Sequence, residues 1–381
     1  MLRIPATGLG PRLTVDLTAL QRNWRALEKV STGALCGAVV KADAYGTGIV
    51  AASEALFAAG ARFFFTATVD EAVAVRRALP AAHIFVLDGL YPGAAATYGA
   101  ERLMPCLSSL GMLEEWLAFC LARNEALPAA LHFDTGMNRL GIRMAETEIA
   151  ARRVGELNFS PQMIMSHLAC ADQPNHEKNR VQLALFQSLL GHFPNIPASL
   201  ANSAALMSSR DYHFQMVRPG IALYGGRAVN GRRNPMARVV TLEAPVLEVK
   251  EARTGESVGY GASYTLARES RIAVLGIGYA DGFVRSLSSS NTHSGGRVVL
   301  RGRILPVIGR VSMDLVTVDI TDLGGDLPLP GEMAEIFGPT LGVDDQADIA
   351  GTIGYELLTS LKLGRFQRRY VDGPESEGGA G

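Results

Sequence analysis

The sequence has few of the features that mark a membrane, nucleic-acid-binding or disulfide-stabilised protein. Its 381 residues include 36 basic and 37 acidic residues, for a formal net charge of -1, and no basic block that would bind nucleic acid or anionic lipid. Only 4 cysteines are present, and they form no CxxC pair or zinc-type spacing. We therefore interpret them as reduced thiols and expect no metal site.

Long apolar runs are also missing from the chain. None approaches the roughly 18 residues of a membrane helix. The N-terminal segment MLRIPATGLGPRLTVDL lacks the continuous apolar core and the cleavage site of a secretory signal. We expect a cytoplasmic protein that acts on a small, near-neutral molecule, with no nucleic-acid or membrane partner.

Apolar residues are nevertheless abundant, and their spacing predicts the architecture. From about residue 34 to 225, short apolar segments alternate with segments in which apolar residues recur every three or four positions, as on one helix face. The expected strands lie at 35–43, 62–69, 83–89, 103–109, 130–136, 162–169, 198–203 and 217–225. Eight successive strand–helix units predict a parallel (β/α)8 barrel of the TIM type, with a doubly wound open sheet as the alternative.

The pattern changes after residue 235 to short alternating strands divided by Gly, Pro, Ser and Asp. At 381 residues the chain also exceeds the length at which a single core usually stops growing. We expect a barrel domain at 1–235 and a β-rich domain at 236–381. Residues 1–16 are expected either in the barrel domain or in a strand that pairs with the C-terminal domain.

Reactive side chains collect where the expected barrel strands end. They are Lys41, Asp134, Arg139, His167, Asn202, Ser203 and Arg218. One such residue alone would more often be a core histidine or half of an ion pair. Because barrel chemistry is built at these strand ends, several cations without a matching excess of carboxylates predict an anionic occupant.

The last two expected strands favour a phosphate as that anion. Ser203 and the turn Pro219-Gly220-Ile221 offer a hydroxyl and backbone N–H groups where barrels commonly bind phosphate. A lysine whose pKa is lowered by burial and by neighbouring cations is a nucleophile suited to a Schiff base. These residues suggest pyridoxal phosphate, with a phosphate-sugar aldolase or isomerase as the alternative.

Nine motifs in order resemble those of one family, the alanine racemases. They are VVKADAYGTG, DTGMNRLGI, SHLACAD, ANSAAL, RPGIALYG, VGYGASY, GYADG, GRVSMD and TIGYELLTSL, and they span almost the entire chain. The resemblance implies a pyridoxal 5'-phosphate enzyme that interconverts L-alanine and D-alanine by a two-base mechanism. It also implies a head-to-tail homodimer with shared active sites, which serves either peptidoglycan synthesis or alanine catabolism.

The resemblance further implies a role for each matching residue. Lys41 binds the cofactor and is one base, and Tyr260 of the partner subunit is the second. The implied cofactor contacts are Tyr45, His167, Asn202, Ser203, Arg218, Gly220, Ile221 and Tyr355. The implied substrate contacts are Arg139, Met313 and Tyr279, and the implied entrance residues are Asp172, Arg285 and Arg310.

Arg218 would face the pyridine nitrogen of the cofactor. An arginine donates hydrogen bonds but does not give up its proton, so the ring becomes a weaker electron sink. Such a ring favours racemisation over transamination. The arginine also argues against the pyridoxal-phosphate decarboxylases of a similar barrel, in which the residue that faces the pyridine nitrogen is expected to be acidic. A tyrosine base needs positive charge nearby, and we expect it from His167 and Arg218.

Two positions depart from the family pattern. His132 stands where many relatives have a carbamylated lysine, and Ser199 stands where members often have a histidine. The support of Arg139 and the hydrogen bonds behind Arg218 are therefore expected to differ. A racemase of broader specificity and a non-catalytic pyridoxal-phosphate carrier are the alternative functions, although carriers resemble the barrel alone.

Overall fold

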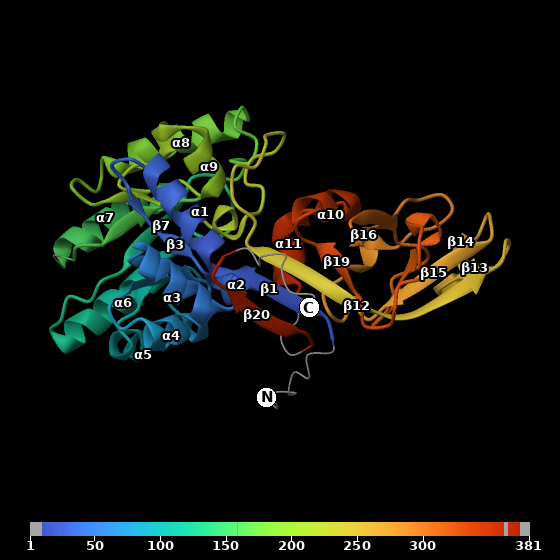
Figure 1. Cartoon of the computed structure of the whole chain (residues 1–381). Coiled ribbons are helices and arrows are strands. Elements are labelled where there is room, and N and C mark those ends of the chain that lie inside the picture. The colour runs from blue at the N-terminus through green and yellow to red at the C-terminus, as the bar shows by residue number, and fades with distance from the viewer. Residues whose placement is uncertain (1–9, 158, 362–364, 374–381) are drawn as a thin grey trace. The chain divides into compact units, whose positions relative to one another are not determined.

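The computed structural model describes residues 10–157, 159–361 and 365–373, which form two compact units (Figure 1). Leu20–Ala237 form the barrel unit. The described residues up to Ala19, together with those from Arg238 onward, form the β-rich unit.

A ring of parallel strands forms the centre of the barrel unit. The strands are β2 (Leu35–Cys36), β3 (Ala38–Val39), β4 (Phe63–Thr66), β5 (His83–Val86), β6 (Met104–Leu107), β7 (Ala130–Asp134), β9 (Met163–Met165), β10 (Ala198–Ser199) and β11 (Met216–Val217). From β3 to β10 each strand pairs in parallel with the next one named. The short β8 (Ile142–Arg143) pairs with β7.

The ring closes through β11. This strand pairs in parallel with β2, which continues into β3 across Gly37. On its other side, the Arg218 N–H donates to the Ala201 carbonyl at 2.9 Å, and Asn202 and Arg218 form a parallel bridge. The predicted (β/α)8 barrel is therefore confirmed, and the open-sheet alternative is wrong.

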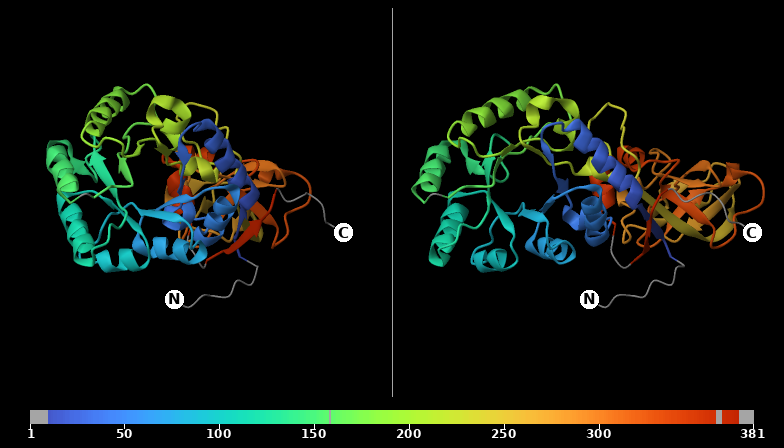
Figure 2. Two further views of the ribbon diagram at one scale, coloured as in Figure 1. Left: turned by 90° about the vertical axis from the view of Figure 1, so that its left-hand side faces the viewer. Right: turned by 60° about the vertical axis from the view of Figure 1, so that its left-hand side comes forward.

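Helices connect the strands and lie outside the ring (Figure 2). They are α1 (Leu17–Val30), α2 (Lys41–Tyr45), α3 (Ile49–Ala59), α4 (Val69–Ala78), α5 (Ala95–Ala100), α6 (Leu110–Arg123), α7 (Thr147–Glu156), α8 (Glu177–Leu190) and α9 (Ser203–Ser208). Inside the ring, β-strand side chains such as Phe65 and Phe85 stack at 4.9 Å between ring centroids and are nearly inaccessible to solvent. The apolar strand residues thus make the core, which leaves the polar residues at the strand ends.

The β-rich unit is built around the long strand β12 (Val240–Ala252). The sheet order is β17 (Arg303–Pro306), β16 (Arg297–Leu300), β19 (Met333–Phe337), β12, β1 (Arg12–Asp16) and β20 (Gln367–Val371). β15 (Ser270–Leu275) pairs with β12 and with β18 (Val316–Asp319). β13 (Ser257–Val258) pairs with β14 (Tyr264–Thr265), and the helices are α10 (Val343–Ala350) and α11 (Gly354–Thr359).

The first described strand of the chain belongs to this second unit. β1 pairs antiparallel with β12 and parallel with β20. Arg12 and Glu243, which are partners in the β1–β12 register, form a salt bridge of 2.8 Å. β1 at Arg12–Asp16 therefore completes the sheet of the β-rich unit, while residues 1–9 lie outside the described residues.

None of the helices in the described segments has the length and apolar character needed to cross a membrane. Within the same segments, no group of three or more His, Cys, Asp or Glu residues is arranged to hold a metal ion.

Candidate active site

Lys41 follows β3 and begins an unusual turn. The four residues Ala42–Tyr45 all have φ between 54° and 55°, in the left-handed region, where each non-glycine residue costs about 1–2 kcal/mol. The turn is held by the N–H of Ile49, which donates to the Asp43 carboxylate at 2.8 Å. The Tyr45 ring also stacks on Tyr224 at 4.6 Å. The motif that follows the lysine is therefore a strained turn fixed by specific contacts.

The environment of Lys41 favours the neutral amine, which is the form that acts as a nucleophile or base. Burial lowers the pKa of Lys41, and the positive charge of Arg139 lowers it further, while Asp88 and Glu71 act in the opposite direction. A lowered pKa increases the fraction of neutral amine at neutral pH. The prediction of a reactive lysine at the end of the first barrel strand has this physical basis.

A hydrogen-bonded cradle lies at the ends of the last two barrel strands. The Ser203 hydroxyl accepts the N–H of Gly220 at 2.8 Å and the N–H of Ala222 at 3.3 Å. Gly220 leaves room here, because a Cβ at this position would collide with the Tyr45 hydroxyl. Asn202 caps α9 by accepting the Ala205 N–H at 3.0 Å. A serine hydroxyl, backbone N–H groups and a tyrosine hydroxyl thus meet at one place, as a phosphate site requires.

Arg218 is a buried cation with two hydrogen-bond acceptors. One guanidinium nitrogen donates to the Ser199 hydroxyl, and the other donates to the Ser166 carbonyl at 2.6 Å. Ser199 in turn donates to the Met216 carbonyl at 2.7 Å. Burial lowers the pKa of Arg218 to about 10, with the Cys106 thiol opposing, so the guanidinium stays charged at neutral pH. Ser199 thus provides an acceptor for Arg218 where relatives often have a histidine.

The surroundings of His167 oppose the positive charge expected from the sequence. Burial lowers the pKa of His167 well below its ordinary value, and the charges of Arg218 and Arg139 lower it further. A second cation beside Arg218 would be both desolvated and repelled. These surroundings favour the neutral imidazole, although the side chain is only partly buried.

His132 occupies the interior of the barrel. It is 7% exposed, and its Nδ1 has no hydrogen-bond partner among the described residues. Burial lowers the pKa of His132 to about 4, and the charges of Arg218 and Arg139 contribute to the shift. A neutral ring therefore stands where many relatives have an anionic carbamate, so Arg139 has no such anionic partner at this position.

Arg139 borders the same small pocket as the two histidines. The pocket is lined by His132, Phe133, Asp134, Met137, Arg139, Leu140, Ser166 and His167. The turn before Arg139 is set by the Asp134 carboxylate, which accepts the N–H groups of Gly136 and Met137 at 2.8 Å each. Arg139 is exposed, so its guanidinium is open to an anionic ligand.

Asp172, which the resemblance predicts at the entrance, is tied to the loop that follows the barrel strands. Its carboxylate accepts the Asn230 side-chain amide at 2.7 Å, and its carbonyl accepts the Asn230 N–H at 2.9 Å.

The remaining candidates lie in loops and short helices of the β-rich unit. Tyr260 is 70% exposed and stands between Gly259 and Gly261, whose φ values are 75° and 74°. The Arg310 guanidinium packs against this turn, since a Cβ on Gly261 would lie 2.9 Å from its Nη1. Only glycine fits such a left-handed position against a side chain without strain.

Two other loops of this unit are joined to each other. The Tyr279 N–H donates to the Ser312 carbonyl at 3.1 Å, and the Ala280 N–H donates to the Met313 carbonyl at 3.0 Å. Arg285 begins the short helix η5 (Arg285–Leu287), and Tyr355 lies in α11. The structure therefore brings Tyr260 together with Arg310 and Tyr279 together with Met313, and it gathers Lys41, Arg139, His167 and Arg218 in the barrel.

Sequence reasoning missed three buried polar residues behind these groups, namely Thr135, Ser166 and Gln182. One signal was available for Gln182. It lies on the buried face of α8 with Phe186 and Leu189, where a polar side chain must find hydrogen-bond partners.

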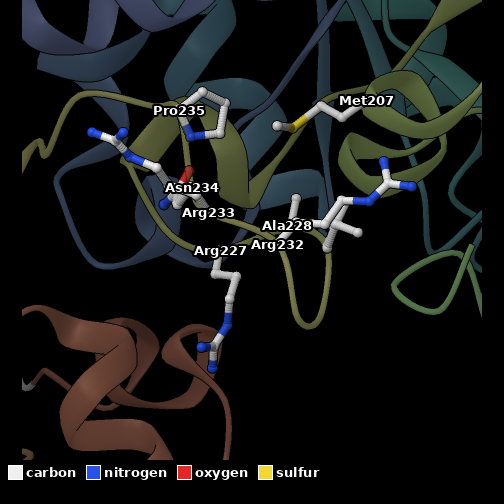
Figure 3. A pocket seen from close by; sticks show the side chains of 8 residues that line it. Met207, Arg227, Ala228, Arg232, Arg233, Asn234 and Pro235 are labelled. Atoms are coloured by element: carbon white, nitrogen blue, oxygen red, sulfur yellow. The ribbon is translucent and has the colours of Figure 1, made fainter.

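A larger pocket of the barrel unit does not form a convergent site. It has a volume of about 190 Å³ and is lined by Met207, Arg227, Ala228, Val229, Arg232, Arg233, Asn234 and Pro235. The side chains of Arg227, Arg232 and Arg233 extend in different directions (Figure 3). The three cations therefore do not converge on one anion, and we place no site there.

The barrel, its strand-end lysine and phosphate cradle, and the following β-rich unit define a class of pyridoxal-phosphate barrel enzymes, and comparison with known proteins specifies the family. Residues 15–228 match the family model of the alanine racemase N-terminal domain, and residues 239–370 match that of the C-terminal domain. The chain belongs to the alanine racemase family.

Individual relatives match over nearly their whole length. The chain is 47% identical to the alanine racemase of Rhizobium meliloti (strain 1021) over 95% of this chain and 97% of that protein. It is 46% identical to the biosynthetic alanine racemase of Agrobacterium fabrum over 94% of this chain and 93% of that protein. The solved alanine racemase of Bartonella henselae, with covalently bound pyridoxal phosphate, has a TM-score of 0.89 and 35% identity, over 95% of this chain and 99% of that chain.

Proposed function

We propose that the protein interconverts L-alanine and D-alanine with pyridoxal 5'-phosphate bound covalently to Lys41. The observation that carries the proposal is the Lys41 amine at a barrel strand end, with its pKa lowered by burial and by Arg139. It stands in one unit with the cradle of Ser203 and Gly220. Family membership supplies the substrate.

The residues present fit the cofactor. The cradle at Ser203 and Gly220 is closed to any side chain at position 220, and the Ser203 hydroxyl, which accepts two backbone N–H groups, keeps its own proton to donate to a phosphate. Tyr45, Asn202 and Ile221 would complete the phosphate contacts. Tyr355, which the motif TIGYELLTSL carries, is proposed as a further contact from the resemblance alone.

Arg218 and His167 would bind the ring of the cofactor. When bound, pyridoxal phosphate supplies an aldehyde for the amines and a ring that draws electrons from the substrate Cα. Arg218 stays protonated and held by Ser199 and Ser166, so it can donate a hydrogen bond to a ring nitrogen without protonating it. This limits electron withdrawal and favours return of the proton to Cα.

Two bases on opposite faces of Cα account for racemisation. Lys41 would take or return the proton on one face, because its lowered pKa leaves part of the amine neutral. The partner subunit's Tyr260 would act on the other face in a head-to-tail homodimer, and the 70% exposure of this side chain in the single chain leaves it available. Arg139 would bind the substrate carboxylate, with the backbone of Met313 and with Tyr279.

A chiral amino-acid panel on the purified holoenzyme tests the proposal. We expect rapid interconversion of the alanine enantiomers and slow turnover of larger amino acids, with Lys41→Ala as the inactive control. Comparable rates across the panel would show a broad-specificity racemase instead. No turnover of any enantiomer by protein loaded with cofactor would leave only a carrier role.

A further inference from the structure

Residues 166–169, which follow β9, carry the His167 side chain and the carbonyl of Ser166 that accepts from Arg218. Few backbone hydrogen bonds of the sheet hold this segment. β9 ends at Met165, and the Ser166 N–H still donates to the Ser199 carbonyl at 3.2 Å. The position of both groups therefore depends on what holds residues 166–169.

A single side chain from α8 holds this segment. The Gln182 amide nitrogen donates to the His167 carbonyl at 2.9 Å, and the Gln182 amide oxygen accepts the Ala169 N–H at 2.9 Å. Gln182 is 0% exposed. A buried amide that lost these partners would leave unpaired polar groups in the core, so the contacts fix the segment strongly.

The same amide reaches Ser166 through Thr135. Gln182 Nε2 donates to Thr135 Oγ1 at 3.2 Å, and Thr135 Oγ1 and Ser166 Oγ lie 2.8 Å apart. Both hydroxyl residues are 1% exposed. We call Gln182, Thr135 and Ser166 the Gln182 clamp. The two N–H donors and the oxygen acceptor of the Gln182 amide are all satisfied within the protein, as a specific buried network requires.

The clamp ends on Arg218. The Ser166 carbonyl is one of two acceptors for this 4% exposed guanidinium, and the Ser199 hydroxyl is the other. A shift of the Ser166 carbonyl would leave a buried cation with one acceptor, so the guanidinium would turn to follow the carbonyl or to find another. The orientation of Arg218 is thereby coupled to a glutamine on the outer helix.

We infer that Gln182 is a positioning residue for the reaction, which acts through Ser166 and His167 to aim Arg218 and the His167 imidazole at the cofactor ring. The inference rests on the proposed function. The bonds of Gln182 go to the Thr135 hydroxyl and to the backbone of His167 and Ala169, so it sets the geometry and leaves proton transfer to Lys41 and the partner's Tyr260. Small displacements of positioned groups can reduce rates by about 100-fold.

The test compares matched substitutions of buried glutamines. Gln182→Met keeps the length of the side chain and removes its hydrogen bonds. Gln346→Met is the control, because Gln346 is 1% exposed in the β-rich unit and its amide nitrogen donates to the carbonyls of Arg297 and Ile336. Both holoenzymes should lose thermal stability. An effect that appears only in Gln182→Met therefore reports positioning and not general destabilisation.

The decisive readout is the absorption spectrum of the bound cofactor, together with kcat and KM for alanine. For Gln182→Met we expect a shifted cofactor band and a kcat lowered by about 10- to 100-fold, with little change in KM. Gln346→Met should keep the wild-type spectrum and kcat. If Gln182→Met behaves like Gln346→Met in both readouts, the positioning role is wrong.

A second pair keeps the inference testable if Gln182→Met does not fold. Thr135→Val removes the hydroxyl of the clamp at constant shape, and Thr135→Ser retains it. The valine variant should shift the cofactor band and the serine variant should not, whereas identical spectra would overturn the clamp. A wild-type holoenzyme that did not turn over alanine would refute the proposed function, while the spectral comparison would still decide the clamp.

Discussion

Replacement of His132 by glutamine should make the barrel less sensitive to acid. The pKa of His132 is lowered to about 4 in the folded chain by burial and by Arg218 and Arg139, against 6.5 for an ordinary histidine. Between these values the unfolded chain binds a proton that the folded chain does not, so stability falls as the pH falls. This one group should remove about 2 kcal/mol of unfolding free energy between pH 7 and pH 5. Glutamine does not titrate, so His132→Gln should lack this part of the loss.

Urea unfolding of the cofactor-free protein at pH 5, 6 and 7 measures the effect. The chain has 2 tryptophans, Trp24 and Trp116, and both lie in the barrel unit, so their fluorescence reports the unfolding of that unit. The comparison concerns the change with pH, and a uniform loss of packing in the variant therefore cancels. His83→Gln, at an exposed histidine of β5, is the matched control for removal of an imidazole. Equal pH dependence in wild type and His132→Gln would show that His132 is not buried as a neutral ring.

Three further substitutions address the candidate site. Gly220→Ala places a methyl group against the Tyr45 hydroxyl, so titration of the cofactor-free protein with pyridoxal phosphate should show affinity lowered by at least about tenfold, and unchanged affinity would contradict the cradle. Arg218→Glu should lower racemisation and raise the yield of pyruvate by transamination, and an unchanged ratio of the two would leave Arg218 only a positional role. Lys41→Ala and Tyr260→Phe dimers should each be nearly inactive, but after subunit exchange their equal mixture should recover about one quarter of wild-type activity, because half the dimers have one intact site. A mixture that stays inactive after verified exchange would exclude shared sites.

The barrel could be predicted because its strands are buried on both faces and so read as continuous apolar segments. The strands in the structure are shorter: Ala198–Ser199 replaces the expected 198–203, and beyond it Ala201 and Asn202 still pair with Arg218. The gathering of Lys41, Ser203 and Arg218 at one end follows from parallel strands alone.

The sequence could not reveal features that depend on partners far apart in the chain. Gln182 and Thr135 are 47 positions apart, and a polar residue on a buried helix face does not specify its partner. The lowered pKa of His167 could not be read from the sequence either, because it depends on burial and on Arg218, which only the fold brings near. The strand partners of β1 were likewise open, since a short alternating segment fits an edge in either domain.

During synthesis, the β-rich unit remains incomplete until the ribosome has made β20. β1 precedes the barrel unit in the chain, yet its partners, β12 at Val240–Ala252 and β20 at Gln367–Val371, both follow that unit. The barrel unit, continuous from Leu20 to Ala237, has all its strands available before either partner is translated. β1 must therefore wait beside a domain that has already been made, with open backbone donors and acceptors that a chaperone or another nascent chain could pair with. β1 leaves the ribosome before the barrel does, and it is paired only after the barrel has been made.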